Sequence, residues 1–577
     1  MTAENEYARW LASGALTESE RAELEAIRDD PDEVESRFGR GLEFGTAGLR
    51  GVMGMGTNRM NIYIVRHATQ AFAETILAAG EADKGAAVCH DCRHNSREFA
   101  EAAACVFAAN GIPVRIFEDM RPTPELSFAV REYGCAGGVN ITASHNPKEY
   151  NGYKVYGADG AQLGPDTAAE VKRRMDAADL FTDVRTMPFD EAAEKGLVTV
   201  MGAETDEAFL QNVCGLILEP EEARKAADRF TLVYTPFHGV GRELVPEALR
   251  RLGLKNIVCE PKQMVPDGDF PTVASPNPEN PEGFALAADL ANEVGADLII
   301  GTDPDSDRVA VMAKDRSGKY AALTGNQAGV LLIDWLIGAL RRTGRMPENP
   351  VVLKTIVTTE MARAAAERNG VRCLDTFTGF KFMAAKKNNL EAAGEGKVIF
   401  SFEESIGYMA GDFVRDKDAV TASLLLAEMA VWYHNRGMTL IDALESLFEK
   451  YGYYGERTVN LMMPGLDGPE RMARLMSGLR ADIPREIAGT AVGEITDYLD
   501  GTVTDIASGR TAKSELSGSD VLRYALADGT VILVRPSGTE PKIKVYVLAR
   551  GESADERGER IEKYGAWAES LAQTGEK

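Results

Sequence analysis

The chain has 577 residues, of which 44% are hydrophobic and 27% charged, and its formal net charge is −25. This length is more than one hydrophobic core supports, so we expect roughly three to five domains. The negative charge argues against nucleic acid or an anionic membrane as a partner, because no segment gathers enough Lys and Arg to overcome the repulsion.

The first thirty residues are polar and helical in pattern, and they show no charged-then-apolar leader. No apolar run is long enough to span a bilayer. Seven cysteines scattered along a long chain suit a reducing compartment, so we expect a cytoplasmic protein. Cys89 and Cys92 form a C-x-x-C without a second such pair, and we interpret them as packing residues at a strand end.

The chain-order pattern predicts an α/β protein. Residues 1 to about 40 read as helices, and short apolar strands then alternate with amphipathic helices in three successive blocks. The last stretch is strand-rich and predicts a smaller C-terminal α+β domain. We therefore expect three similar α/β domains and a fourth, with ranges 1–205, 206–318, 319–454 and 455–577.

The first chemistry-bearing segment is "ITASHNPKEYNGYKVYG", residues 141–157. Pro147 and Gly152 break regular structure between two predicted strands and force a tight loop. Ser144 therefore lies where the first strand bends into the loop. Two titratable residues, His145 and Lys154, are near it in the chain. A polar surface turn is the alternative interpretation.

The second segment is "GTDPDSDRVAV", which follows the apolar strand "ADLIIG". Asp303, Asp305 and Asp307 repel one another unless a cation lies among them, and oxygen ligands favour Mg²⁺. An EF-hand loop that begins at Asp303 is excluded. Such a loop needs Gly at its sixth position and Glu at its twelfth, where this chain has Arg308 and Lys314. A solvated acidic turn or an aspartate-based phosphatase are alternatives, but the phosphatase leaves the serine loop unexplained.

The third segment is "VRPSGTEPKIKVY", residues 534–546. Arg535 ends a strand, and the turn at Ser537, Gly538 and Thr539 offers backbone N–H and hydroxyl donors. Such a set suits a phosphate group, although a plain hairpin turn is the alternative. The basic residue that follows is Lys542 or Lys544.

Three weaker segments offer further binding groups. Glu403 and Ser405 in "FEESIG" pair an acceptor with a donor, which suits sugar hydroxyls. "TGFK" supplies Thr378, Gly379 and Lys381, which bring a hydroxyl and a cation to a cleft or simply turn the chain. A glycine-rich loop around residues 45–56 carries Arg50, a candidate phosphate contact.

A nucleophile, a cation site, a distal phosphate site and hydroxyl-binding segments are all required when a phosphoryl group moves between two positions of one sugar. Ser144 would carry the group, and His145 or Lys154 would handle the proton. The distal loop would hold the other phosphate of the substrate for in-line transfer.

The motifs "TASHNP", "GTDPDSDR", "FEESIG" and "RPSGTEP", in this order over about four hundred residues, resemble those of the α-D-phosphohexomutases. The chain looks most similar to the branch of bacterial phosphoglucomutases near the phosphopentomutases and sugar-bisphosphate synthases. The resemblance implies four domains around a central cleft, three of them α/β domains with mixed sheets.

By this resemblance, Ser144 is the phosphoserine, and Asp303, Asp305, Asp307 and a phosphate oxygen on Ser144 bind Mg²⁺. His145 and Lys154 match the proton-handling positions, and Arg50 and Arg308 match active-site arginines. The substrate-binding residues are Thr378, Gly379, Lys381, Glu403, Ser405, Arg535, Ser537, Gly538, Thr539 and Lys544.

The activity implied is interconversion of glucose 1-phosphate and glucose 6-phosphate through a bisphosphate intermediate, with glucose 1,6-bisphosphate as activator. Phosphopentomutase, phosphomannomutase and glucose 1,6-bisphosphate synthase activities remain open on the same scaffold. A sugar-phosphate sensor is disfavoured, because a sensor need not keep a nucleophile. The sequence leaves the oligomeric state unknown.

Overall fold

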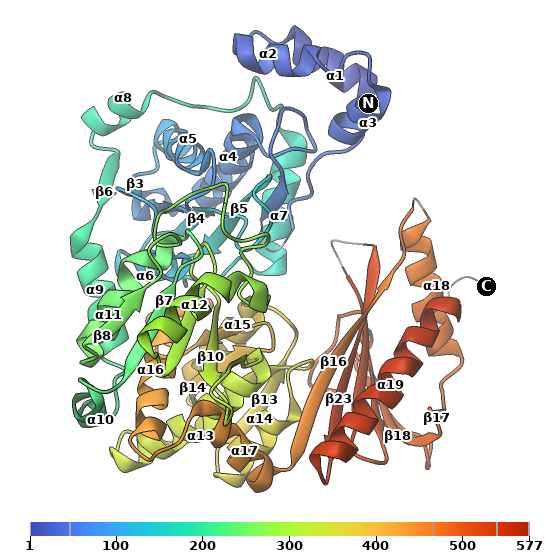
Figure 1. Cartoon of the computed structure of the whole chain (residues 1–577). Coiled ribbons are helices and arrows are strands. Elements are labelled where there is room, and N and C mark those ends of the chain that lie inside the picture. The colour runs from blue at the N-terminus through green and yellow to red at the C-terminus, as the bar shows by residue number, and fades with distance from the viewer. Residues whose placement is uncertain (1, 46–47, 466, 538–540, 575–577) are drawn as a thin grey trace.

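The structure is a computed structural model that describes residues 2–45, 48–465, 467–537 and 541–574. Four sheets follow one another along the chain, preceded by a unit of three helices (Figure 1). Short 3₁₀ helices lie at Ala82–Lys84, Val240–Arg242 and Pro281–Phe284. In the described part of the chain, no helix has both the length and the apolar character needed to cross a bilayer.

The N-terminal unit consists of α1 (Ala3–Ala12), α2 (Glu18–Glu25) and α3 (Pro31–Phe38). The side chains of Thr2, Thr17 and Asp30 cap their first turns by accepting hydrogen bonds from backbone N–H groups. As the sequence predicts, this region is helical.

The first domain is a six-stranded mixed sheet in the order β1-β5-β4-β2-β3-β6. Strand β4 runs parallel to β2 but antiparallel to β5, so the connection between β4 and β5 is a loop, and that loop carries Ser144. The elements are β1 (Leu49–Val52), α4 (Ile62–Ala78), β2 (Ala86–His90), α5 (Ser96–Ala109), β3 (Val114–Phe117), α6 (Thr123–Glu132), β4 (Gly137–Ile141), β5 (Tyr150–Gly157), α7 (Pro165–Ala177), α8 (Phe189–Glu194) and β6 (Val198–Met201).

The second domain has a five-stranded mixed sheet in the order β11-β10-β9-β7-β8. Its central strand β9 is buried along its whole length and ends immediately before Asp303. The elements are α9 (Ala203–Cys214), α10 (Pro220–Ala226), β7 (Thr231–Thr235), α11 (Leu244–Leu252), β8 (Asn256–Cys259), α12 (Ala285–Val294), β9 (Leu298–Thr302), β10 (Val309–Lys314) and β11 (Tyr320–Ala322).

The third domain has a four-stranded mixed sheet in the order β13-β12-β14-β15. Strand β14 ends at Glu403, and α16 is apolar on nearly every side because it is buried along most of its length. The elements are α13 (Gly325–Arg342), β12 (Pro350–Thr355), α14 (Glu360–Arg368), β13 (Arg372–Thr376), α15 (Phe380–Ala392), β14 (Lys397–Glu403), β15 (Gly407–Met409), α16 (Ala419–His434) and α17 (Leu440–Tyr451).

The fourth domain is an antiparallel sheet in the order β16-β23-β22-β21-β18-β19-β20, with β17 paired to β18. The elements are β16 (Tyr453–Met462), α18 (Gly468–Ala481), β17 (Glu486–Ile487), β18 (Thr490–Asp497), β19 (Thr502–Asp505), β20 (Thr511–Lys513), β21 (Leu522–Leu526), β22 (Val531–Pro536), β23 (Lys542–Gly551) and α19 (Ala554–Thr574). The predicted fold class, three α/β domains with mixed sheets and a smaller α+β domain, is confirmed.

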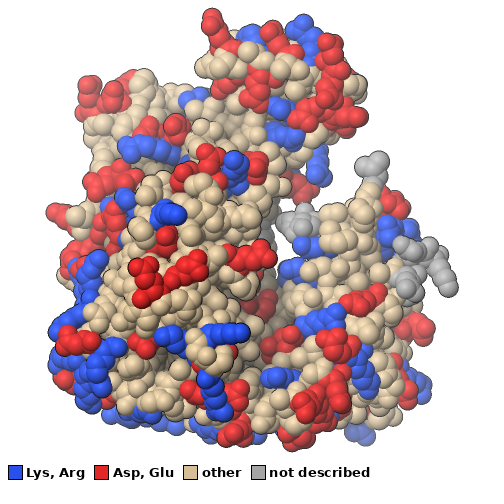
Figure 2. All heavy atoms as spheres, viewed as in Figure 1, with Lys and Arg blue, Asp and Glu red and all other residues tan. Residues whose placement is uncertain are grey.

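The apolar cores explain how the domains hold together. The second and third domains share one continuous core, which Phe128 of the first domain also joins. The first domain has two further clusters and the fourth domain has a main core of its own. A smaller cluster joins Ile356 and Val357 of the third domain to Leu533 and Tyr546 of the fourth. Figure 2 shows the surface hollowed between the fourth domain and the rest of the molecule.

Strands β4, β9 and β14 each run parallel to a neighbouring strand of their own sheet, and their carboxyl ends meet at the centre of the molecule. The carboxyl ends of parallel strands are where α/β sheets bind their ligands. The fold thus brings the segments after three separate strands to one place. The boundaries 1–205, 206–318, 319–454 and 455–577 stay predictions.

Candidate active site

The Ser144 loop is held in a conformation that few residues adopt. Ser144 has a φ of +52°, and its backbone N–H donates to Thr142 Oγ1 at 2.8 Å. The fully buried guanidinium of Arg93 donates to the carbonyl oxygens of Ser144, Asn146, Pro147 and Tyr150. The buried guanidinium of Arg93 therefore stabilises the conformation of the loop that carries Ser144.

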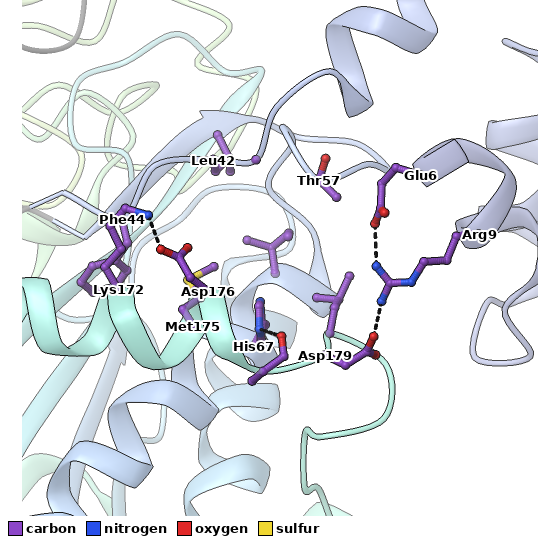
Figure 3. A pocket seen from close by; sticks show the side chains of 14 residues that line it. Glu6, Arg9, Leu42, Phe44, Thr57, His67, Lys172, Met175, Asp176 and Asp179 are labelled. Carbon is purple, nitrogen blue, oxygen red and sulfur yellow. Dashed lines mark hydrogen bonds and ion pairs between the residues drawn. The ribbon is translucent and has the colours of Figure 1, made fainter. Parts of the chain in front are cut away.

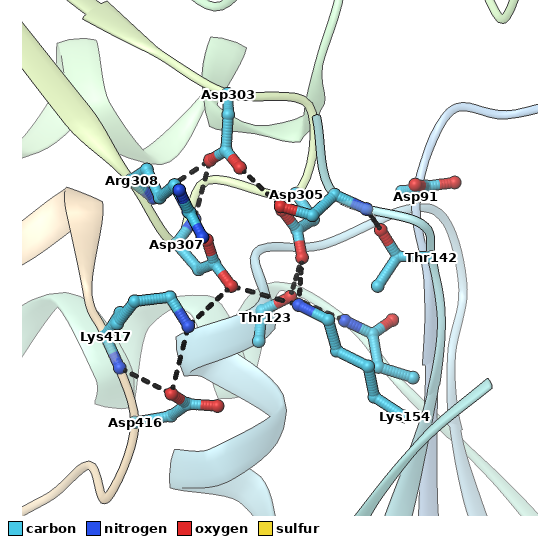
Figure 4. Close-up of polar contacts among 12 residues, drawn as sticks. Asp91, Thr123, Thr142, Lys154, Asp303, Asp305, Asp307, Arg308, Asp416 and Lys417 are labelled. Carbon is cyan, nitrogen blue, oxygen red and sulfur yellow. Dashed lines mark hydrogen bonds and ion pairs between the residues drawn. The ribbon is translucent and has the colours of Figure 1, made fainter. Parts of the chain in front are cut away.

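Ser144 meets the acidic loop of the second domain. Its hydroxyl donates to Asp303 Oδ2 at 2.8 Å, across 159 positions of the chain. The other oxygen of Asp303 accepts from the backbone N–H groups of Asp307 and Arg308, and Ser306 between them has a φ of +53°. The loop curls so that three carboxylates face one point (Figure 4).

These carboxylates fit a divalent cation. One oxygen of each of Asp303, Asp305 and Asp307 lies within 4.8 Å of the others, and all three residues are buried. The Oδ1 atoms of Asp305 and Asp307 are buried and accept no hydrogen bond from any described residue. Unsatisfied buried carboxylate oxygens are costly, and a hard ion such as Mg²⁺ suits an all-oxygen set.

Lys154 partly neutralises the acidic loop from the first domain. Its ammonium group contacts Asp305 Oδ2 at 2.7 Å and Asp307 Oδ2 at 2.9 Å. Burial alone would lower the pKa of Lys154, but the two carboxylates raise it above its ordinary value. Burial and the neighbouring carboxylates raise the pKa of Asp303 well above its usual range.

His145 lies beside the serine, with Nδ1 at 3.2 Å from Ser144 Oγ. Burial, together with the nearby charges of Arg308 and Arg50, lowers the pKa of His145 well below its usual value. The imidazole is therefore neutral at pH 7. Arg50 Nη1 also donates to Asn146 Oδ1 at 2.9 Å, which holds Arg50 against the serine loop.

The predicted sugar-binding segments come together in the third domain. Glu403 Oε1 accepts from the Gly379 backbone N–H at 2.7 Å, and Glu403 Oε2 accepts from Ser405 Oγ at 3.4 Å. Thr378 Oγ1 is buried without a hydrogen-bond partner among the described residues. Burial and the charge of Arg535 lower the pKa of Lys381 to about 8.

The fourth domain contributes a group of cations. Arg535 on β22 pairs in register with Lys544 on β23, so both side chains lie on one face of the sheet. Burial and the like charges of Lys542 and Arg535 lower the pKa of Lys544. Like charges opposite each other destabilise a sheet unless an anion binds between them. Ser537 donates its backbone N–H to Lys542 O, whereas Gly538 and Thr539 lie outside the described residues.

The sequence prediction missed two residues of the third domain, Asp416 and Lys417. Lys417 Nζ lies 3.1 Å from Asp307 Oδ2 and 3.4 Å from Asp416 Oδ1 (Figure 4). Asp416 in turn accepts hydrogen bonds from Tyr156 and Gln162 of the first domain. The run "RDKD" at 415–418 is buried although such runs usually face solvent. The feature of the sequence that could have indicated burial is that this run directly precedes the apolar helix α16.

Thr123 at the start of α6 was also missed. Its hydroxyl donates to Asp305 Oδ2 at 2.7 Å, and its backbone N–H donates to Asp305 O at 2.9 Å. Asn140 Nδ2 donates to the same hydroxyl at 2.7 Å, which leaves the hydroxyl hydrogen directed at the carboxylate. Nothing local in "RPTPE" marks this long-range contact.

Comparison with known protein families matches the chain in four successive segments. The matches are the phosphoglucomutase/phosphomannomutase alpha/beta/alpha domain I at residues 41–181, domain II at 207–318, domain III at 324–451 and the C-terminal domain at 487–561. The N-terminal helices precede the first matched segment.

Curated relatives match over nearly the whole chain. The phosphoglucomutase of Staphylococcus epidermidis is 35% identical over 521 residues, which cover 90% of this chain and 93% of the relative. The phosphoglucomutase of Staphylococcus aureus N315 is 35% identical over 540 residues, which cover 92% of this chain and 94% of the relative.

Solved structures share the fold at lower identity. The Paramecium phosphoprotein pp63/parafusin, a phosphoglucomutase in its open form, aligns with a TM-score of 0.68 at 19% identity and covers 92% of this chain and 96% of its own. A phosphoglucomutase/phosphomannomutase family protein from Burkholderia thailandensis aligns with a TM-score of 0.64 at 20% identity, covering 91% of this chain and 96% of its own. The chain therefore belongs to the phosphoglucomutase/phosphomannomutase family, the α-D-phosphohexomutases that its motifs resemble, and is an enzyme of the isomerase class.

Proposed function

We propose that the protein is a phosphoglucomutase that interconverts glucose 1-phosphate and glucose 6-phosphate through a phosphorylated Ser144. The observation that carries the proposal is the contact between the Ser144 hydroxyl and the Asp303 carboxylate, which joins a nucleophile to a cation-binding cluster from another domain. The 35% identity to bacterial phosphoglucomutases supports glucose as the sugar.

In the proposed reaction, the phosphorylated Ser144 donates to the free hydroxyl of the sugar phosphate. The bond between phosphorus and Ser144 Oγ breaks and the bond between phosphorus and the sugar oxygen forms. The hydroxyl proton of the sugar passes to a base, and Ser144 Oγ takes up a proton as it leaves. His145 is the favoured base, because its ring nitrogen lies 3.2 Å from Ser144 Oγ. Lys154, whose charge is paired with two carboxylates, is suited to stabilise negative charge.

The bisphosphorylated sugar then rotates within the cleft, and the phosphoryl group at its other end is transferred to Ser144. Both orientations need a second phosphate site, for which we propose Arg535, Lys544 and Lys381. The site would also include Ser537, Gly538 and Thr539. Glu403, Ser405, Thr378 and Gly379 would bind the sugar hydroxyls and keep the ring between the two phosphate sites. Arg50 and Arg308 would contact the phosphoryl group near Ser144.

Asp303, Asp305, Asp307 and a phosphate oxygen on Ser144 would hold Mg²⁺. When bound, the ion neutralises charge on the transferring oxygens. Glucose 1,6-bisphosphate would act as the activator, because it can phosphorylate Ser144 again if the intermediate escapes. We expect these steps to take place in the cytoplasm.

Coupled assays with glucose, mannose, ribose and deoxyribose 1-phosphates test the proposal. Each sugar is assayed with and without Mg²⁺ and with and without its 1,6- or 1,5-bisphosphate. We expect fastest turnover with glucose 1-phosphate, dependence on Mg²⁺ and stimulation by glucose 1,6-bisphosphate. Preference for a pentose or mannose phosphate would reassign the substrate. Bisphosphate formation that requires an external phosphoryl donor would identify a synthase instead.

A further inference from the structure

The N-terminal unit, α1–α3, lies outside the four matched family segments, which begin at residue 41. It stands at one end of the molecule against the first domain (Figure 1). Trp10 packs edge-to-face against Phe38 within the unit and against Tyr63 and Phe181 of the first domain. The unit is thus attached to the domain that carries Ser144.

The unit shares the hydrophobic core of the first domain, since Trp10, Leu24 and Phe38 belong to the same buried cluster as Tyr63 and Ile64. Arg9 forms ion pairs with Glu6 at 2.9 Å and with Asp179, beyond α7, at 2.6 Å (Figure 3). Beside these residues, a cavity of about 260 Å³ lies between α1, α4 and α7. Besides this core, polar contacts of α2 and α3 join the unit to a loop of the first domain.

A pair of charged residues in the unit binds one loop of the first domain, Met53–Met60. Glu23 Oε1 accepts from the Met55 backbone N–H at 2.9 Å, and Arg37 Nη1 donates to Met55 O at 3.3 Å. Glu23 and Arg37 also pair with each other at 2.5 Å. The pair therefore binds both polar groups of one peptide residue in the loop.

The backbone of α3 and of the residues that follow it adds further contacts to the same loop. Asn58 N–H donates to Arg37 O at 2.9 Å, and Thr57 Oγ1 donates to Arg40 O at 3.0 Å. Gly56 has a φ of +134°, and a side chain there would meet the Arg37 backbone oxygen and Cβ at 2.9 Å. The loop and α3 approach more closely than any residue but glycine allows.

This loop continues directly from β1, which carries Arg50. Met60 N–H donates to Val52 O at 2.8 Å, and Met53 N–H donates to Glu149 O, next to the serine loop, at 2.8 Å. Arg50 itself contacts Asn146 of the serine loop. The loop Met53–Met60 thus lies between the N-terminal unit and the strand that presents Arg50.

We propose that the N-terminal unit is a brace for the active site, and that Glu23 and Arg37 are positioning residues that act through Arg50. They hold the loop Met53–Met60, which fixes β1 and so the place of the Arg50 guanidinium beside Ser144. The proposal rests on the proposed function, since it assigns Arg50 to the phosphoryl group. A misplacement of about 1 Å there is enough to lower the rate substantially.

A double-mutant cycle in the full-length protein tests this proposal. We expect Arg37→Ala to lower kcat about tenfold with little change in KM, and Arg50→Ala to lower it by about a hundredfold. In the Arg50→Ala background, Arg37→Ala should cause no further loss. Additive losses, or full activity of Arg37→Ala, would overturn the proposal. Glu23→Ala, which removes the acceptor of the Met55 N–H, is the second variant if Arg37→Ala does not fold, and the same loss of kcat is expected for it.

The matched control is Arg28→Ala, which removes an exposed ion pair with Glu25 at 3.7 Å on the same unit. It should leave kcat unchanged. Hydrogen exchange gives a readout that needs no activity: amides of residues 49–60 should exchange faster in Arg37→Ala than in the wild type or Arg28→Ala. Unchanged exchange would refute the brace even if the wild type is an active mutase, whereas an inactive wild type with faster exchange in the variant would refute only the proposed function.

Discussion

The Ser144 hydroxyl donates a 2.8 Å hydrogen bond to Asp303 Oδ2, although the two residues belong to different domains. This contact brings the proposed nucleophile to the acidic cluster. The strained backbone at Ser144, with its φ of +52°, fixes the direction of the hydroxyl. The first two predictions test the two sides of this contact.

Ser144→Ala should abolish incorporation of a phosphoryl group and lower turnover by at least about a thousandfold, because no other hydroxyl replaces the nucleophile. The fold should persist, since alanine removes only one oxygen atom. Mass spectrometry after incubation with glucose 1,6-bisphosphate measures the incorporation, and circular dichroism checks the fold. A variant that keeps most of its turnover would remove Ser144 from its role.

Asp305→Asn should lower kcat by about 10²–10⁴-fold and change KM much less, because the carboxylate acts on charge that develops during transfer. The substitution keeps the side-chain size but leaves Lys154 with one charged partner. Steady-state kinetics at several Mg²⁺ concentrations measure the effect. A change confined to KM would indicate that Asp305 only binds the ground state.

Arg535→Ala should change KM more than kcat, which is the reverse of the effect expected for Asp305→Asn. We expect KM to rise by at least about tenfold, because Arg535 is proposed to hold the phosphate that does not react. The cross-strand neighbour Lys544 keeps part of the charge on that face of the sheet. Substrate titration measures KM. An unchanged KM would contradict the phosphate-binding role of this strand end.

The pH dependence of substrate binding should report Lys381, whose pKa is lowered to about 8 by burial and the charge of Arg535. Below pH 8 the ammonium group is charged and attracts a phosphate, whereas above pH 8 it is neutral. The KM for glucose 1-phosphate should therefore rise as the pH increases through 8. In Lys381→Arg the side chain stays charged, so this rise should disappear. The same rise in wild type and variant would assign it to another group.

The sequence by itself determined the element types and the order of the motifs. Strands "ADLIIG" and "GGVNI" are apolar and bounded by glycine or proline, so their ends, and therefore the loops at Ser144 and Asp303, follow from local pattern. The three α/β blocks were predictable for the same reason. The roles of these residues came from a resemblance, since spacing alone leaves alternatives open.

Only the tertiary structure decided which side chains meet. The Thr123 hydroxyl reaches Asp305 across 182 positions, and Lys417 reaches Asp307 from a third domain. The run at 415–418 is charged, so local pattern favours solvent, yet the packing of three domains buries it against the acidic loop. Such contacts depend on how whole domains pack, and the apolar core that the second and third domains share contributes to that packing.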